Sequence, residues 1–196
     1  MGEPRLFVDG LSDAVLSDAV LSDDGLYRYD LWRRWGHGPL LGWVMLNPST
    51  GDDATDDHTL RRCQHYARRD GWAGIVVRNL YAYRTPDPKV MVAAARRGVD
   101  VVGPENDEWL ARLAGDRFGV RQIVVAYGAG PASRSAADAI LLGERCAAVE
   151  RILFAAGRPL YRMEPDPNRM APGPRCPHPA RLANACPIVP LSPVYA

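Results

Sequence analysis

Apolar runs of strand length alternate with stretches of helical pattern along this chain, and this alternation limits the possible folds more than any other feature. Three runs are long and apolar enough for strands buried on both faces: 40–46 (LLGWVML), 72–80 (WAGIVVRNL) and 122–127 (QIVVAY). A fourth strand is expected at either 152–155 or 160–163. Helical patterns occupy the intervals, at 58–70, 89–97, 104–117 and 133–149. Such alternation builds βαβ units, so the sequence predicts a three-layer α/β/α fold with a mainly parallel central sheet of about four strands.

The chain before the first buried run is expected to form an N-terminal β-hairpin. The segment 19–35 (AVLSDDGLYRYDLWRRW) contains two extended stretches joined at Asp23-Asp24-Gly25. An Asp-Gly pair tolerates the positive φ of a tight hairpin turn. Upstream, a five-residue near-repeat (LSDAV, LSDAV, LSDDG) is too short to be a solenoid unit. We therefore expect residues 1–18 to be an N-terminal extension and 19–196 to form a single α/β domain.

Composition excludes several classes of protein. The 196 residues carry 24 basic and 23 acidic side chains, a net charge of +1, so any nucleic-acid binding must depend on local patches. No apolar run approaches the roughly 20 residues that cross a bilayer, and the start MGEPRLFVDG lacks the order of a secretory signal. The four cysteines are scattered without a CxxC pair, so free thiols are expected. We expect a cytoplasmic monomer with no membrane or protein partner.

In sheets of this kind, ligands bind beyond the carboxyl ends of the strands. Four stretches should meet there: 47–57, 78–84, 128–134 and the loop around His178. Asn47-Pro48 follows the first buried run, where a short amide can hold a water or contact a ligand, although Asn-Pro is also a common turn. Asn79 follows the second run, and its amide suits the Watson–Crick edge of a pyrimidine.

The remaining candidates each have a functional and a structural interpretation. Tyr81 and Tyr83 can stack on a base or pack beside the sheet. Gly128 begins GAGPAS, which lets backbone amides approach a phosphate but lacks the third glycine of a dinucleotide fingerprint. Acidic residues at 52, 53, 56 and 57 suit a hard cation or the cap of the following helix, and we predict no metal there.

His178 lies in CPHPARL, where prolines fix the loop and keep the imidazole away from regular structure. It can stabilise an anion, transfer a proton or bind a metal. Cys63 and His65 together with Cys176 and His178 form two Cys-x-His elements. Cys63 and His65 fall on different faces of a helix, so a metal site is not predicted.

Taken in order, Asn47-Pro48, Asn79, the glycine after the third strand and His178-Pro179 resemble the uracil-DNA glycosylase superfamily. In that superfamily a leucine four residues after the histidine wedges into the duplex, and Leu182 has this offset. The fuller pattern MLNPST, DDHTLRRC, RNLYAYRTPDP and GPEND also resembles a bacterial family of unknown function over roughly residues 19–191. The superfamily resemblance implies a uracil-DNA glycosylase-like fold.

The resemblance also implies roles for individual residues. Asn47 would position the water that attacks the sugar C1′, and His178 would stabilise charge on the departing base. Asn79 would read the flipped base, with Pro48, Ser49 and Gly128 beside it and Tyr81 or Tyr83 stacked on it. Arg181 would hold a flanking phosphate and Leu182 would fill the gap in the duplex. An uncharged Asn47 is a poor general base, so such an enzyme would be slow or need an activated leaving group.

Three functions from different classes follow from these residues. The first is a DNA glycosylase-like hydrolase that cleaves the N-glycosidic bond of uracil or a modified pyrimidine. The second is an enzyme of the same fold that acts on a free nucleoside or nucleotide, consistent with the near-zero net charge. The third is a nucleic-acid-binding module without catalysis. Because the cysteines do not match an iron–sulfur quartet, no cofactor is expected.

Overall fold

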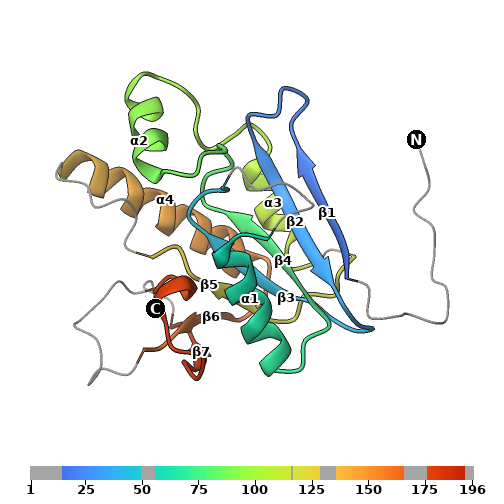
Figure 1. Ribbon diagram of the computed structural model, residues 1–196. Helices are drawn as coiled ribbons and strands as arrows, with labels where there is room; N and C mark the ends of the chain where they lie inside the picture. Colours follow the sequence, from blue (N-terminus) through green and yellow to red (C-terminus); the bar gives the residue numbers. More distant parts are fainter. Residues whose placement is uncertain (1–14, 50–55, 116, 129–135, 166–175, 193–196) are drawn as a thin grey trace.

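A computed structural model describes residues 15–49, 56–115, 117–128, 136–165 and 176–192. Within these residues the protein is a mixed α/β structure, with one sheet of seven strands and four α-helices (Figure 1). The strands are β1 Leu16–Leu21, β2 Arg28–Arg34, β3 Leu41–Met45, β4 Gly74–Asn79, β5 Ile123–Val125, β6 Leu160–Met163 and β7 Ile188–Pro190. The helices are α1 His58–Arg69, α2 Pro88–Arg96, α3 Asn106–Arg112 and α4 Ala136–Ala155, with a 3₁₀ turn η1 at Pro179–Arg181.

The sheet has the order β1-β2-β4-β3-β5-β6-β7. The four central strands are parallel to one another, whereas β1, β2 and β7 pair antiparallel at the edges. The predicted sheet of about four mainly parallel strands therefore corresponds to the centre only. The described sheet is larger because the hairpin pairs onto β4 and because β7, which the sequence did not predict, pairs onto β6.

The N-terminal hairpin is confirmed. Gly25 has φ +69°, and its amide donates to the Ser22 carbonyl at 2.9 Å, which closes the turn between β1 and β2. β1 begins at Leu16, inside the stretch predicted to be an extension, and residues 1–14 lie outside the described residues. The hairpin brings the first residues of β2 beside the segment that follows β4, since the Arg28 amide donates to the Ala82 carbonyl at 2.9 Å.

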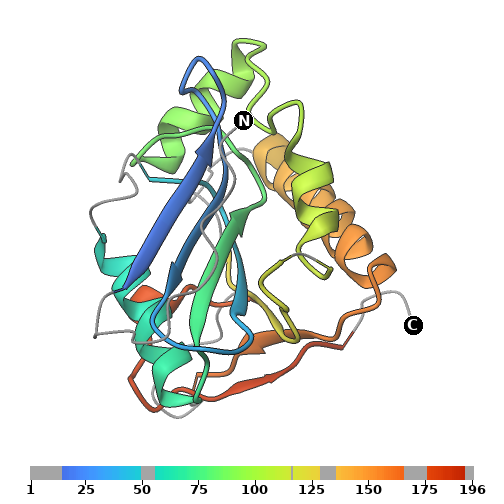
Figure 2. The same ribbon diagram turned by 90° about the vertical axis from the view of Figure 1, so that its right-hand side faces the viewer.

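Helices cover both faces of the sheet (Figure 2). Alternate residues of the buried strands point to opposite faces, so Trp43 packs with α1 while Val44 packs with α2, α3 and α4. The expectation of three layers agrees with these two separate apolar clusters. Trp43 and Tyr66 of α1 are fully buried, with ring centroids 6.3 Å apart. No helix among the described residues is long and apolar enough to span a membrane.

Helix boundaries differ from the expected ones where apolar pattern alone is ambiguous. The run 152–155, one of two candidates for the fourth strand, is the last turn of α4, and Leu160–Met163 is the strand. A short apolar run has no period of its own, so a buried helix end and a strand look alike. α3 is shorter than the expected 104–117, ending at Arg112 before Leu113 and Gly115 form a turn.

A buried ion pair ties the hairpin to the parallel core. Arg78 Nε of β4 donates to Asp30 Oδ1 of β2 at 2.8 Å, and both side chains are at most 2 % exposed. The Arg78 guanidinium also lies 5.4 Å from the ring centroid of Trp109 in α3. Burial raises the pKa of Asp30 more than Arg78 lowers it. The pair therefore links β2, β4 and α3 in a site with little solvent.

Candidate functional site

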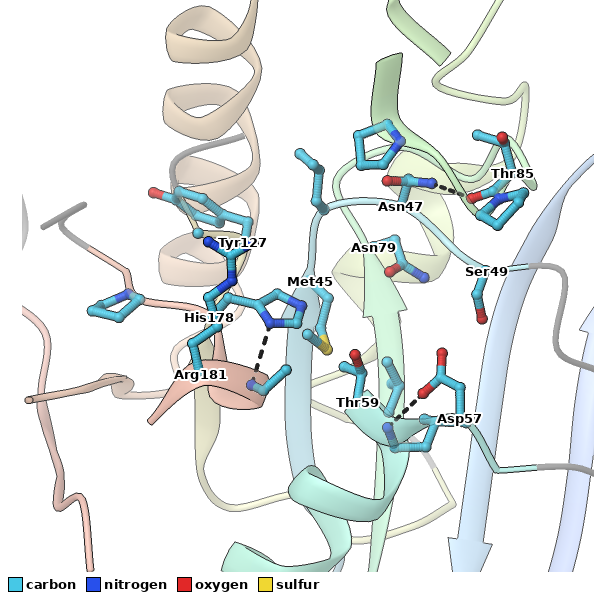
Figure 3. Close-up of a pocket in the computed structure, with 18 of the residues that line it drawn as sticks. Met45, Asn47, Ser49, Asp57, Thr59, Asn79, Thr85, Tyr127, His178 and Arg181 are labelled. Atoms are coloured by element: carbon cyan, nitrogen blue, oxygen red, sulfur yellow. Dashed lines mark hydrogen bonds between the residues drawn. The ribbon is translucent and has the colours of Figure 1, made fainter. Parts of the chain in front are cut away.

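A pocket of about 560 Å³ lies at the carboxyl ends of β3, β4 and β5 (Figure 3). This is the location expected for parallel strands, whose carboxyl ends share one edge of the sheet. The pocket combines five segments: the start of β2, the loop after β3, the start of α1, the end of β4 with the 85–88 turn, and the loop 177–182 beside Gly128. Its polar and glycine lining residues are Arg28, Asn47, Ser49, Asp57, Thr59, Asn79, Thr85, Tyr127, Gly128, His178 and Arg181.

Asn47 is half-buried, and the turn around it fixes its amide. Its Nδ2 donates to the carbonyls of Thr85 at 2.9 Å and Pro48 at 3.2 Å. Because an amide nitrogen has two hydrogens, both are committed, and the amide oxygen is the group that remains to accept a hydrogen bond from a ligand or water. Pro48 is buried and its carbonyl also accepts from the Thr85 amide at 3.0 Å, so it holds the turn without lining the pocket.

Asn79 contributes a buried amide. The residue is 2 % exposed, and Asn106 Nδ2 donates to its backbone carbonyl at 3.1 Å. Among the described residues, none forms a hydrogen bond with the Asn79 side chain. A buried amide is costly without partners, so a donor and an acceptor are available here for the polar edge of a ligand.

His178 caps the 3₁₀ turn η1 and faces the pocket. Its Nδ1 accepts from the Ala180 amide at 3.3 Å. Burial lowers the pKa of His178, and the nearby Arg181 lowers it further. The imidazole is thus neutral at neutral pH, and since Nδ1 accepts, Nε2 carries the proton and is a donor. In Figure 3 the His178 imidazole and the Asn79 amide point toward the same space, with Met45 between them.

Gly128 positions the loop that carries His178. Its φ is +73°, and a Cβ added there would lie 3.3 Å from His178 Cβ. Its amide donates to the Cys176 carbonyl at 2.8 Å, which ties this loop to the end of β5. The structure therefore gives Gly128 a close-packing role beside the imidazole.

Two charged residues of the pocket, Arg28 and Asp57, were not predicted as ligand-binding groups. Arg28 is 4 % exposed, and burial lowers its pKa to about 10, so it stays charged at neutral pH. The nearby Asp57 partly offsets this by raising the pKa of Arg28. The Asp57 side chain also caps α1, where it accepts from the Leu60 amide at 2.8 Å. The available signal for Arg28 was its position in the run LYRYDLW, where Arg28 and Asp30 are charged and the other residues are aromatic or apolar. Its position in the pocket follows only from the antiparallel pairing of β2 with β4.

The other predicted site residues are divided between the pocket and the core. Ser49 and the exposed Arg181 line the pocket. Leu182 also lines it, but is 7 % exposed and packs in the cluster below α1, so it is a wall here and does not project as a wedge. Tyr81 is 8 % exposed in the opposite cluster, where burial raises its pKa to about 12. Tyr83 packs edge-on against Tyr27, with centroids 6.4 Å apart. Neither tyrosine lines the pocket.

Tyr127, which was expected only as a strand residue, supplies the aromatic surface that lines the pocket. Its hydroxyl donates to Glu150 Oε1 at 3.0 Å, away from the cavity. Burial raises the pKa of this phenol. The ring is thus fixed at one end, and its other atoms contact the cavity.

The acidic stretch serves local structure where it is described. Asp57 caps α1, as one of the two interpretations predicted, and Asp56 accepts from Arg33 Nε at 3.0 Å. Residues 52 and 53 lie outside the described residues. Within the part of the chain that the structure covers, no three His, Cys, Asp or Glu side chains gather as metal ligands. Cys63 is buried with its Sγ 3.9 Å from Met45 Sδ.

Comparison with known proteins identifies a family but no individual relative. Neither the curated proteins nor the solved structures contain a significant match to the chain. One family model, described as a protein of unknown function (DUF1643), matches residues 28–163. The match includes Asn47, Asn79 and Gly128 and ends before the loop of His178. Since it covers more than half of the sequence, the chain belongs to the DUF1643 family of proteins of unknown function.

Proposed function

We propose that this protein hydrolyses the N-glycosidic bond of uracil or a modified pyrimidine in DNA. The observation that carries the proposal is the convergence of Asn47, Asn79 and His178 on one cavity of about 560 Å³. Cavities of roughly 300–1,000 Å³ are typical of sites for small ligands, so a flipped nucleoside is within range. The three side chains come from three different segments, and a shared role in binding one ligand accounts for their meeting.

The order of these residues along the fold supports membership of the uracil-DNA glycosylase-like superfamily. Asn47 follows β3, Asn79 ends β4, Gly128 follows β5 and His178 follows β6. This is the order of motifs that the superfamily resemblance requires, and the first three lie at the carboxyl ends of adjacent parallel strands. A fold can host several chemistries, so the activity is argued from the side chains.

Each side chain has a distinct part in the proposed reaction. The Asn79 amide would pair with the polar edge of the pyrimidine. The oxygen of Asn47 would accept a hydrogen bond from a water and direct its oxygen toward C1′. As the water oxygen bonds to C1′, the bond from C1′ to the base nitrogen breaks and its electron pair leaves with the base. His178 Nε2–H would stabilise the resulting negative charge, and the proton of the water passes to solvent.

Arg28 favours a second candidate, an N-glycosidic hydrolase or a transferase acting on a free nucleotide. A buried guanidinium that lines the same cavity can form two parallel hydrogen bonds with a phosphate. The buried position of Leu182 also agrees with a ligand that needs no wedge into a duplex. Both candidates place the base between Asn79 and His178. They differ in whether the sugar belongs to a DNA strand or to a free nucleotide.

The test is base release from defined substrates. Single- and double-stranded oligonucleotides with uracil, mismatched thymine or modified cytosines would be incubated with protein and cleaved with alkali at abasic positions. Deoxyuridine monophosphate and other free nucleotides would be assayed in parallel for released base. Wild type, Asn47→Ala, His178→Ala and the remote variant Gly143→Ala would be compared.

The results separate the candidates. Oligonucleotide cleavage that is lost in Asn47→Ala and His178→Ala but kept in Gly143→Ala supports a DNA glycosylase. Base release from free nucleotides alone supports the second candidate. DNA binding without base release, unchanged in Asn47→Ala, would reject both and leave a binding module.

A further inference from the structure

A strongly basic groove lies at the amino-terminal ends of the parallel strands, opposite the pocket. Its volume is about 660 Å³. The groove is lined by Arg34 at the end of β2, the loop 37–39 before β3, the loop 117–121 before β5 and Arg158 before β6. In Figure 1 the arrowhead of β2, which ends at Arg34, lies at the end of the sheet away from α2. The groove therefore shares no wall with the pocket.

Four of the described residues that line the groove are arginines, Arg34, Arg117, Arg121 and Arg158, and the lining contains no carboxylate. The charge of Arg117 also acts on the buried Asp30, whose pKa it lowers. Elsewhere in the described structure arginines pair with acids, as Arg78 does with Asp30. None of the four groove arginines forms an ion pair with a described residue. Four guanidinium groups that line one groove repel one another, and a bound anion relieves that repulsion.

Backbone carbonyls hold two of these arginines in place, and an aromatic ring holds a third. Arg34 Nη1 donates to the carbonyl of Gly38 at 2.9 Å, and Arg158 Nε to that of Ala114 at 2.9 Å. The Arg117 guanidinium lies 5.0 Å from the ring centroid of Phe118. These contacts use some of the N–H donors of Arg34 and Arg158, and the other N–H donors of each guanidinium are available to a ligand. The charges are thus arranged before any ligand binds.

The loops that carry them are joined to one another. The Leu40 amide donates to the Phe118 carbonyl at 3.2 Å, and the Gly42 amide to the Gln122 carbonyl at 3.0 Å. The Phe118 ring packs on Trp32, with centroids 5.5 Å apart. Hydrogen bonds and ring packing therefore hold together the loops that form the groove at this edge of the sheet.

We propose that this groove binds the phosphate backbone of a nucleic-acid strand without reading its sequence. Guanidinium groups bind phosphate oxygens through paired hydrogen bonds, and several in a row match a chain of phosphates. The groove offers little that recognises a base, because its aromatic ring, Phe118, is 6 % exposed and cannot stack. A free nucleotide would leave its base without partners here. The site does not depend on the activity proposed for the pocket.

The experiment measures binding of a labelled, unmodified single-stranded oligonucleotide by fluorescence anisotropy between about 50 and 200 mM salt. The test variant is Arg117→Gln/Arg121→Gln, which changes two exposed side chains and spares the backbone-bonded Arg34 and Arg158. The control is Arg96→Gln/Arg97→Gln, which alters net charge equally at the far end of α2. Melting followed by circular dichroism verifies that each variant is folded.

We expect the test variant to bind about tenfold more weakly and to lose about 1.4 from the slope of log K against log salt, the value for two single-strand phosphate contacts. Arg117→Lys/Arg121→Lys should keep most of that slope, since it keeps both charges. Equal weakening in the Arg96→Gln/Arg97→Gln control, or no weakening in the test variant, overturns the proposal. Displacement of the oligonucleotide by inorganic tripolyphosphate at equal phosphate concentration overturns the assignment to a strand and indicates a small phosphate ligand.

Discussion

Two polar residues of the pocket, Asn47 and His178, each use one side-chain atom to hold a position and present another to the cavity. Asn47 anchors through Nδ2 and offers its oxygen, while His178 anchors through Nδ1 and offers Nε2–H. The sequence indicated Asn47 and Asn79 because they follow buried apolar runs, and His178 because prolines fix its loop away from regular structure. It could not indicate which atom of each side chain is committed, since that depends on carbonyls as distant as Thr85.

At Gly128 we predict that an added methyl group disturbs the imidazole. Gly128→Ala should reduce base release at least tenfold and destabilise the protein by about 1–2 kcal/mol, because alanine resists φ +73° and its Cβ would press on His178. Gly143→Ala is the matched control: it lies in α4 with open space around its Cβ position and should stabilise the helix by up to about 1 kcal/mol. Urea unfolding and the base-release assay check both. Full activity in Gly128→Ala would refute the positioning role.

The lowered pKa of His178 predicts a pH dependence of stability. Between the folded pKa and the ordinary value of 6.5, the unfolded chain takes up a proton that the folded protein resists. The contribution of His178 is therefore present above pH 6.5 and is lost as the pH falls through its folded pKa. His178→Gln should lose less stability than wild type when urea unfolding is repeated from pH 7.5 to pH 5.5. Identical losses would show that the imidazole titrates normally.

At the scale of elements, the sequence was most informative where burial and turn chemistry acted together. The three apolar runs became β3, β4 and β5, and the Asp-Gly turn joined β1 to β2. β7 is three residues long and ends at Pro190, so it is too short to show the alternation of apolar and polar residues that marks a strand, and it was not predicted. The pairing of β2 with β4 was equally invisible, because strand order is set by contacts between distant segments. That pairing is what brings Arg28 into the pocket.

Asp57, the residue that caps the start of α1, also lines the pocket, so its two roles need separate substitutions. Asp57→Ala should destabilise the protein by about 1 kcal/mol, since the side chain caps the helix through the Leu60 amide. Asp57→Asn should keep the cap and remove only the charge near Arg28 and His178. Thermal melting distinguishes them. An equal loss of stability in both variants would show that charge, not capping, supports the helix.

At the scale of the whole molecule, the Arg78–Asp30 ion pair joins the β1–β2 hairpin, the parallel strands and α3. Asp30→Ala should destabilise the protein by about 3–5 kcal/mol, because it leaves Arg78 buried without its carboxylate. The double substitution Asp30→Leu/Arg78→Met removes both charges and should recover part of that loss. Denaturant unfolding of the two variants provides the comparison. If the double variant were the less stable, the pair itself would be contributing net stability.

The pocket is closed by residues 176–182, whereas the strands beneath it come from earlier in the chain. During synthesis, β2 to β5 leave the ribosome well before the histidine loop does. Until that loop has been synthesised, the strand ends that carry Asn47 and Asn79 have no imidazole to face. Any ligand that needs His178 is bound only after this late segment has emerged, so the onset of binding reports that translation has passed residue 182.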